Sequence, residues 1–460
     1  MMYGLGFISF VKQNYSLNSI KLVGKNDIDK NGSINDSLLS ISELISLKSP
    51  EFNNNAYSFF NPLLFNGHLQ TFYAAVGDFT KIDEIYYGRE ILQYEDGGIG
   101  SIDRVISKDQ FYSNHCNDND KIHELLPPRT RMLTDLEIKD YYSQKDNQYR
   151  PLLVVLHGLT GGSFESYVRC LFSKLHEDAQ VFDCLVLNSR GCANSKISTP
   201  QLFCGLWTED LRFLIKNLKL QFPSRPIFAA GFSLGGSMLA NYIGQEGDDC
   251  QLTAAAILGN PWDLTESSYT LSRSLIGRNI YSPIMAMNLK NLLLKNLPEL
   301  SKDELFQQSF NKNFDKINSI TEFDNFFTCK MFGFNTAFEY YRHGSSVNRL
   351  LNFRIPTLII NSRDDPIVSS DSIPYKEVEA NPYLMMLITD HGGHLGWFKY
   401  NNERWYADPL AKFFQGYIDL VELDKNGKTK VVVDQKSLPV QNSFVKDRID
   451  IEKIQHNYTI

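Results

Sequence analysis

An α/β fold with a mainly parallel central sheet, flanked by helices and carrying a helical cap insertion, is predicted by three features of this 460-residue chain. Short apolar runs rich in Leu, Val, Ile and Ala recur, as expected for strands buried on both faces of a parallel sheet. Helical stretches with short connections alternate with these runs. The alternation then stops between Trp262 and Arg354, where the sequence is mostly helical, and resumes afterwards.

The predicted elements follow one another closely from residue 151 onward. Strands are expected at residues 152–156, 184–187, 227–230, 254–258, 357–360 and 384–388. Helices are expected at 165–175 and 208–218, and another begins near Ser237. Before them, extended runs at 86–94 and 99–106 flank the turn Asp96-Gly97-Gly98, which predicts a hairpin.

Three regions are expected along the chain. Residues 1–55 are Asn- and Ser-rich and weakly patterned, and are interpreted as a polar N-terminal extension. Residues 56–423 form the α/β domain, with the cap insertion at about 262–354, and residues 424–460 form a polar C-terminal tail. The apolar residues of 284–297 recur at helical spacing, and they either pack on the body of the domain or line a tunnel for an acyl chain.

Charge and composition exclude several classes of protein. A net charge of −7 argues against nucleic-acid binding, which needs clustered Lys and Arg. The seven cysteines are odd in number and irregularly spaced, so neither a disulfide framework nor a zinc site is expected, and a reducing compartment fits best. No run of 18 apolar residues occurs, so no membrane-spanning helix is expected. The mildly apolar start lacks a basic leader and is interpreted as a terminus that is frayed or locally packed, with contact to a membrane surface as the alternative.

The segment Gly231-Phe232-Ser233-Leu234-Gly235 matches the pattern G-x-S-x-G and stands between a predicted strand and a predicted helix. This context predicts a sharp strand-to-helix turn that lifts the serine hydroxyl above the sheet. The flanking glycines are needed because side chains there would collide with the neighbouring strand and helix. Ser233 is therefore predicted to be a nucleophile.

A serine nucleophile needs a general base. Where the serine stands on a strand-to-helix turn of this kind, the base is normally a His later in the chain. His391 and His394 both stand directly after the last predicted strand. We favour His394, because Gly392 and Gly393 allow the loop to bend and present it to the serine, and His391 is then a solvated or supporting residue.

The base in turn needs a carboxylate, which should follow the strand at 357–360. Asp364 and Asp365 are both candidates. Asp365 is favoured because it directly precedes Pro366-Ile367-Val368, and Asp364 remains open as the alternative. The amides of Leu234 and of Leu159, in the segment His157-Gly158-Leu159, are predicted to form the oxyanion hole, with His157 ordering that loop.

Together these segments resemble family 4 of the α/β-hydrolase superfamily, and within it the fungal branch of monoacylglycerol lipases and medium-chain fatty acid ethyl ester synthases/esterases. The resemblance covers about residues 60–420. It is carried by Asn66–Thr71 (NGHLQT), Tyr87–Glu90 (YGRE), His157–Gly162 (HGLTGG), Asn188–Cys192 (NSRGC), Gly231–Gly236 (GFSLGG), Asn260–Leu264 (NPWDL), Tyr340–Arg342 (YYR), Asn361–Val368 and Gly392–His394.

The resemblance implies an α/β-hydrolase fold and a cofactor-free serine esterase with a triad of Ser233, His394 and Asp365 or Asp364. Its substrates are expected to be lipid esters, most of all monoacylglycerol, because the stretch from His394 to Leu410 looks most like the monoacylglycerol-lipase members. Transfer of a medium-chain acyl group from acyl-CoA to ethanol is the alternative activity. A cytoplasmic location is implied, with peripheral association with lipid droplets or outer organelle membranes.

Two further interpretations are weighed against this one. A hydrolase fold used only for binding is disfavoured by the intact set of Ser, Asp and His, and metal-dependent hydrolysis by the absence of a ligand cluster. An H-x-x-x-x-D acyltransferase box has been suggested for the family, and His115 and Asp120 fit its spacing. They lie in a polar excursion before the core, with no nucleophile nearby, and we interpret the match as coincidence.

Overall fold

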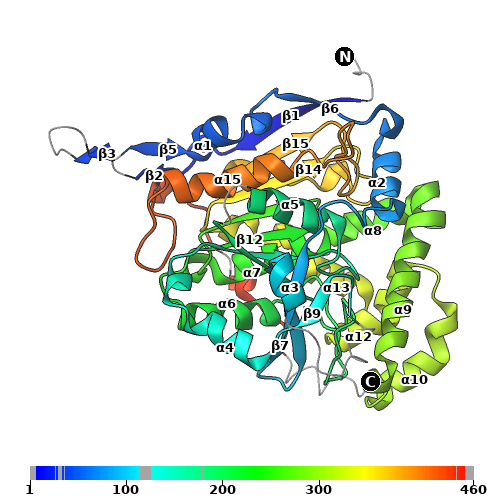
Figure 1. Ribbon diagram of the computed structural model, residues 1–460. Coiled ribbons are helices and arrows are strands. Elements are labelled where there is room, and N and C mark those ends of the chain that lie inside the picture. Colours follow the sequence, from blue (N-terminus) through cyan, green and yellow to red (C-terminus); the bar gives the residue numbers. More distant parts are fainter. Residues whose placement is uncertain are drawn as a thin grey trace.

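The computed structural model describes residues 7–25, 27–28, 34–35, 37–113, 126–177, 181–441 and 443–450. In that part of the chain, eleven strands form one mixed sheet in the order β6-β1-β15-β14-β13-β12-β10-β11-β8-β7-β9 (Figure 1). Their bounds are Ile8–Tyr15 (β1), Tyr57–Phe59 (β6), Tyr86–Gln93 (β7), Ile99–Ile106 (β8), Thr130–Met132 (β9), Leu152–Leu156 (β10), Asp183–Asn188 (β11), Ile227–Phe232 (β12), Ala254–Leu258 (β13), Thr357–Ser362 (β14) and Leu384–Thr389 (β15).

The centre of the sheet, from β11 through β10, β12, β13 and β14 to β15, is parallel throughout. The hairpin of β7 and β8 is added antiparallel to β11, and β1 is added antiparallel to β15 at the other side. The predicted fold class, a mainly parallel sheet flanked by helices, is therefore confirmed. Small separate sheets contain β2 (Lys21–Val23), β5 (Leu38–Ser40) and β16 (Val431–Val432), and β3 (Asp27–Ile28) with β4 (Ile34–Asn35).

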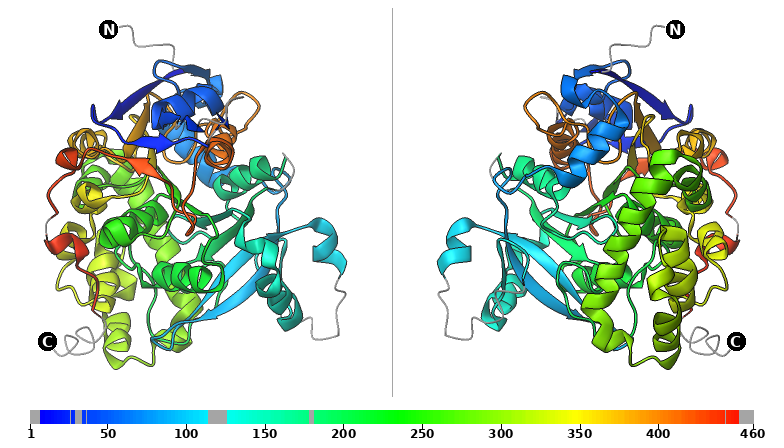
Figure 2. Two further views of the ribbon diagram at one scale, coloured as in Figure 1. Left: turned by 90° about the vertical axis from the view of Figure 1, so that its left-hand side faces the viewer. Right: turned by 90° about the vertical axis from the view of Figure 1, so that its right-hand side faces the viewer.

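Helices cover both faces of the sheet (Figure 2). Those outside the cap are α1 (Ile41–Lys48), α2 (Gly67–Val76), α3 (Lys108–Ser113), α4 (Asp135–Ser143), α5 (Ser166–Glu177), α6 (Glu209–Gln221), α7 (Leu234–Glu246), α14 (Tyr375–Ala380) and α15 (Ala407–Leu420). Alternate strand residues face opposite layers: Leu153 and Val155 belong to the core shared with α5 and α15, whereas Leu152 and Val154 belong to the core shared with α6 and α7. A strand apolar on both faces is the reason why residues 152–156 read as one continuous hydrophobic run.

The cap between β13 and β14 is helical and shares a hydrophobic core with residues 192–207, which follow β11. It consists of α8 (Leu264–Arg273), the π-helix η6 (Gly277–Tyr281), α9 (Ser282–Leu300), α10 (Glu304–Asn313), α11 (Ile320–Phe323), the π-helix η8 (Asp324–Thr328), α12 (Cys329–Met331) and α13 (Ala337–Gly344). Leu289, Leu292 and Leu293 of α9 are buried in this core. Part of the apolar stripe at 284–297 therefore packs in this shared core and part of it also lines a cavity described below, whereas Ile284 is exposed.

The stretch expected as a polar extension contributes to the central sheet. Val11 to Tyr15 of β1 pair with Thr389 to Met385 of β15, and Val11 is buried. The physical reason is that a strand at this position buries one face only, so a few apolar residues in a polar context suffice for it. The C-terminal stretch also packs in part: β16 pairs with β2, and Val445 is buried.

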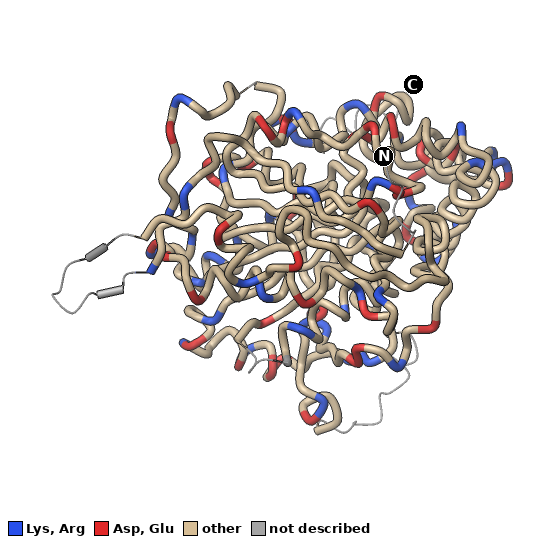
Figure 3. The backbone as a smooth tube through the Cα atoms, turned by 90° about the horizontal axis from the view of Figure 1, so that it is seen from above, with Lys and Arg blue, Asp and Glu red and all other residues tan. Residues whose placement is uncertain are grey.

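Acidic and basic residues are interspersed along the described backbone and are not gathered in one basic stripe (Figure 3). Within the described ranges, no helix is both long and apolar enough to cross a bilayer.

Candidate active site

The turn between β12 and α7 holds Ser233 in a strained backbone conformation. Its φ of 52° and ψ of −122° lie in the left-handed half of the map, where a residue with a Cβ is disfavoured by about 1–3 kcal/mol. The neighbouring glycines make the turn possible: a Cβ on Gly231 would lie 2.6 Å from the carbonyl oxygen of Gly235, and one on Gly235 would lie 2.4 Å from that of His157. The sequence pattern thus produces the sharp strand-to-helix turn that was expected.

The loop after β15 brings His394 to this serine. Its Nε2 lies 2.8 Å from Ser233 Oγ, and its Nδ1 lies 2.8 Å from Asp365 Oδ2. Nδ1–H therefore donates to the carboxylate, which leaves Nε2 free to accept the serine proton. Of the two candidate histidines, His394 is the one that contacts Ser233.

Asp365 is fixed by its second oxygen as well as by the imidazole. Oδ1 accepts hydrogen bonds from the amides of Ile367 at 2.8 Å and Val368 at 2.9 Å. Its side chain is completely buried. Two backbone donors and one imidazole donor satisfy the carboxylate where water cannot reach it, which keeps it oriented.

Asp364 faces a different set of partners. Its Oδ2 lies 3.1 Å from Nδ1 of His391, and its Oδ1 accepts from the amide of Gly393 at 2.9 Å. The hydrogen bond to Asp364 raises the pKa of His391 above its usual value. Asp365 thus supports His394, and Asp364 supports His391. Asp364 also anchors the loop on which His394 stands.

Helix α2 supports this loop, a role that the sequence pattern did not indicate. The hydroxyl of Thr71 accepts the amide N–H of His394 at 2.8 Å and donates to the carbonyl of Gly67 at 2.7 Å. Gly67 itself lies against Asp364, since a Cβ there would be 1.8 Å from the carbonyl oxygen of Asp364. Asn66 caps the helix by accepting from the amide of Leu69. The segment NGHLQT is therefore a platform for the acid and histidine loops.

The loop after β10 is ordered by His157. Its Nδ1 lies 2.7 Å from the carbonyl oxygen of Gly158, and its Nε2 accepts the amide N–H of Ser189 at 3.1 Å. These partners require the neutral imidazole, and burial lowers the pKa of His157 to about 4. His157 thus joins the loops after β10 and β11 and has no contact with Ser233 that would suit proton transfer.

A buried polar network holds the same two loops from the side of the β7-β8 hairpin. The carboxylate of Asp103 accepts two hydrogen bonds from Arg89, at 2.7 and 2.8 Å, and one from Asn188 at 2.8 Å. The hydroxyl of Ser163 also donates to Asp103, and Arg89 donates to the carbonyl of Ala193. A fully satisfied network of this kind rigidifies its surroundings, which explains why the segments YGRE and NSRGC accompany the serine motif.

A cavity of about 900 Å³, including its open mouth, lies above Ser233 and beneath the cap. Leu159 and Leu234, the two residues whose amides were predicted to bind an oxyanion, line it together with Ser233. The opposite wall is formed by apolar side chains of the cap, among them Leu271 and Leu289. The mainly apolar lining suits an apolar part of a ligand whose reactive group lies at the serine.

In the described part of the chain, no group of three or more His, Cys, Asp or Glu side chains is placed to hold a metal ion. His115 and Asp120, the pair with the acyltransferase-box spacing, lie outside the described residues.

Comparison with known proteins agrees with these features. Residues 151–399, which contain Ser233, Asp365 and His394, match the model of the alpha/beta hydrolase fold family. A monoacylglycerol lipase of Saccharomyces cerevisiae is 36% identical over 390 residues, covering 83% of this chain and 85% of that protein. Medium-chain fatty acid ethyl ester synthase/esterase 2 of the same yeast is 37% identical over 432 residues, covering 86% of this chain and 94% of that protein. An esterase structure from Pyrococcus furiosus is 17% identical, with a TM-score of 0.42, and covers 74% of this chain and 96% of that one.

Proposed function

We propose, from the premise that this chain belongs to the α/β hydrolase fold family and is an ester hydrolase, that Ser233, His394 and Asp365 are its catalytic triad. The observation that supports this most directly is the continuous chain of contacts from Ser233 Oγ to His394 Nε2 and from His394 Nδ1 to Asp365 Oδ2, each of 2.8 Å. That arrangement matches what general-base activation of a serine requires.

The catalytic cycle follows from the positions of these groups. His394 removes the proton of Ser233 as its oxygen attacks the ester carbonyl, and Asp365 stabilises the imidazolium that forms. The amides of Leu159 and Leu234 bind the oxyanion, each worth about a hundredfold to a thousandfold in rate. His394 then protonates the departing alcohol, and water attacks the acyl-enzyme to release the carboxylic acid.

We propose that the substrates are lipophilic esters, with monoacylglycerol as the preferred class. The cavity above Ser233 is lined mainly by apolar side chains, which suits an acyl chain. The yeast relative named as a monoacylglycerol lipase supports the same class. No cofactor takes part in this scheme.

Acyl transfer to an alcohol is the second candidate activity. The relative named as an ethyl ester synthase/esterase, at 37% identity, favours it. The chemistry differs in the last step alone, because an alcohol rather than water attacks the acyl-enzyme, and medium-chain acyl-CoA is then the acyl donor.

One set of measurements tests both activities. Wild type and Ser233→Ala are compared on 1-octanoylglycerol, on p-nitrophenyl esters of graded chain length, and on octanoyl-CoA with ethanol. Wild type is expected to hydrolyse the lipid esters and to react with a fluorophosphonate probe, and Ser233→Ala is expected to do neither. Folded wild-type protein that does not react with the probe would favour a hydrolase fold used for binding alone, and activity on short polar esters only would contradict the lipid substrate.

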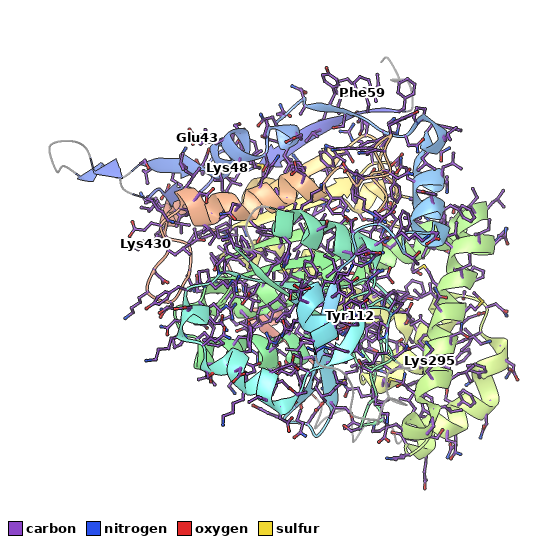
Figure 4. The ribbon with its side chains drawn as sticks, viewed as in Figure 1. Glu43, Lys48, Phe59, Tyr112, Lys295 and Lys430 are labelled. Atoms are coloured by element: carbon purple, nitrogen blue, oxygen red, sulfur yellow. The ribbon has the colours of Figure 1, made fainter. Side chains whose placement is uncertain are left out.

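We further propose that this protein is cytoplasmic and docks peripherally on a lipid surface, such as a lipid droplet or an outer organelle membrane. Exposed apolar side chains stand on α2 and on the adjoining part of the cap, and we call this set the apolar rim: Phe72, Val76, Ile276, Ile280 and Ile284. The two parts are joined by a contact of 3.0 Å between His68 Nδ1 and the hydroxyl of Tyr281. Figure 1 shows α2 beside the upper end of α9. Phe59, labelled in Figure 4, adds a further exposed ring near this end of the molecule.

Flotation with phosphatidylcholine-coated triacylglycerol droplets tests the apolar rim. Wild type is expected to float with the droplets, and Phe72→Ser combined with Ile284→Ser is expected to remain in the aqueous fraction, because exposed apolar area drives interfacial binding. Leu220→Ser is the matched control, since Leu220 is 71% exposed on α6, away from the rim. Equal flotation of all three proteins would contradict the proposed surface.

A further inference from the structure

The cap contributes a group of polar side chains to the wall of the cavity above Ser233. Ser267 and Ser268 come from α8, Asp324 and Thr328 from the π-helix η8, and Tyr341 from α13. We call these five residues the cap polar cluster. The surrounding cap side chains in the wall are mostly apolar, so these polar groups need an explanation of their own.

Contacts within the cap bring the cluster to one place. The hydroxyl of Tyr341 donates to Asp324 Oδ2 at 2.7 Å. Ser268 Oγ lies 3.1 Å from the hydroxyl of Thr321, which stands three residues before Asp324 and hence on the same side of its helix. Tyr341, Asp324 and, through Thr321, Ser268 therefore lie close together in the cavity wall, whereas the hydroxyl of Ser267 donates to the carbonyl of Asp263.

Asp324 is a buried carboxylate that has no cation to balance it. It is 7% exposed, and burial raises its pKa to about 6. No Lys, Arg or His among the described residues forms an ion pair with it, and its hydrogen bonds come from Tyr341 and Thr328. A charge in such a place is costly unless donors satisfy it. The π-helix that presents it is itself an irregularity common at functional sites.

The cluster lies near the reacting centre. The amide of Gly205 donates to the hydroxyl of Tyr340 at 2.9 Å, and a Cβ on Gly205 would lie 3.2 Å from the side chain of Leu234. Leu234 follows the nucleophile directly, and Tyr340 precedes Tyr341 of the cluster. The cap polar cluster and Ser233 therefore line the same cavity, so one bound molecule can contact both.

We propose that the cap polar cluster, with Asp324 as the hydrogen-bond acceptor, is a subsite for an aliphatic hydroxyl group of the substrate. The inference rests on the proposed ester hydrolysis and adds a determinant of substrate choice. A hydroxyl group donates a further hydrogen bond to the carboxylate without bringing a second charge into an apolar cavity, whereas a plain acyl chain adds no donor to those of Tyr341 and Thr328. The hydroxyl belongs either to the glycerol part of a monoacylglycerol or to a hydroxylated acyl chain.

Three esters of equal chain length separate these two sources: 1-octanoylglycerol, ethyl octanoate and ethyl 8-hydroxyoctanoate. The measured quantity is the ratio of kcat/KM for each hydroxyl-bearing ester to that for ethyl octanoate. In Asp324→Leu, the ratio for 1-octanoylglycerol is expected to fall about tenfold to a hundredfold if the glycerol hydroxyl binds there, because a hydrogen bond to a charged group is lost. The ratio for ethyl 8-hydroxyoctanoate is expected to fall by the same factor if the acyl chain supplies the hydroxyl.

Two more variants keep the result interpretable. Asp324→Asn retains the shape and one acceptor but removes the charge, so the same ratio should fall by a smaller factor, and this variant decides the question if Asp324→Leu does not fold. Asp303→Ala removes the cap of α10, whose Phe306 amide donates to Asp303 at 2.8 Å, without lining the cavity. A general loosening of the cap should lower all three activities together and leave the ratios unchanged.

Unchanged ratios in active Asp324 variants would overturn the subsite while leaving ester hydrolysis intact. A rise in kcat/KM on longer-chain esters in Asp324→Leu, equal for esters with and without a hydroxyl group, would also overturn it. The cluster would then limit the length of the acyl chain. Absence of hydrolysis of all three esters by wild type would instead overturn the proposed function, and the subsite with it.

Discussion

Replacing Asp365 by Asn is expected to remove most of the activity because the new amide can be oriented in only one way. Oδ1 of Asp365 accepts two backbone N–H bonds, from Ile367 and Val368, so the amide oxygen of Asn must take that position. Its NH₂ group then faces Nδ1 of His394, 2.8 Å away in the wild type. An NH₂ group can only donate there, which places the imidazole proton on Nε2, the atom that must accept the proton of Ser233.

The size of the loss follows from this wrong tautomer. A triad that keeps its geometry but holds its His in the wrong tautomer loses about 10⁴-fold in kcat, or roughly 5 kcal/mol of transition-state stabilisation. Asp364→Asn should cost about tenfold or less, since Asp364 contacts His391 and the amide of Gly393 rather than His394. The two substitutions are neighbours of identical chemistry, and each is the control for the other.

Steady-state kcat on p-nitrophenyl octanoate and the rate of fluorophosphonate labelling measure both variants. Far-ultraviolet circular dichroism and the thermal midpoint check that each remains folded. If Asp365→Asn kept more than a tenth of the wild-type kcat while Asp364→Asn lost about a thousandfold, Asp364 would be the acid and the assignment drawn from the hydrogen bonds would be refuted.

Three other predictions concern the supports of the site. Thr71→Val removes the acceptor for the amide of His394 and should lower kcat about tenfold, with Thr71→Ser near wild type; equal kcat for both would contradict a positioning role. Gly67→Ala places a methyl group 1.8 Å from the carbonyl of Asp364 and should lower the free energy of unfolding by about 3 kcal/mol, seen as a lower thermal midpoint, whereas an unchanged midpoint would disprove the close approach. His157 has its folded pKa lowered to about 4 from 6.5, so the unfolded state binds more protons in that window, and stability should fall by about 3 kcal/mol as the pH falls through it. Denaturant unfolding of wild type and His157→Gln at several pH values measures this, and an equal pH dependence in both proteins would refute it.

Local patterns predicted the parts of the site that are encoded locally. The elbow at Ser233 needs only a strand, two glycines and a helix in sequence, and the loop of His394 needs only its place after the last strand. The acid remained open between Asp364 and Asp365 because adjacent residues in a loop point in different directions, and spacing alone does not say which one meets His394.

Supports that depend on distant parts of the chain could not be predicted. Thr71 and His394 are 323 positions apart, and nothing in the segment around Thr71 indicates its partner. β1 was missed for a related reason: its buried face is small, and its Asn- and Ser-rich surroundings are typical of loops. Likewise, the carboxylate of Asp324 stands in a stretch whose pattern indicates helix and says nothing of a cavity.

The pairing of β1 with β15 has a consequence for how the protein is made. Val11 meets Thr389, and the hydroxyl of Ser9 accepts the amide of His391, so a segment synthesised early braces a loop synthesised late. Contacts between residues so far apart in the sequence form slowly, because the intervening chain loses conformational entropy before the contacts can stabilise the fold. During translation the edge of β1 that pairs with β15 stays unpaired until β15 has been synthesised. An unpaired strand edge can pair with other nascent chains. The active site therefore forms late in biosynthesis. We expect chaperones that bind early strands to increase the yield of active enzyme.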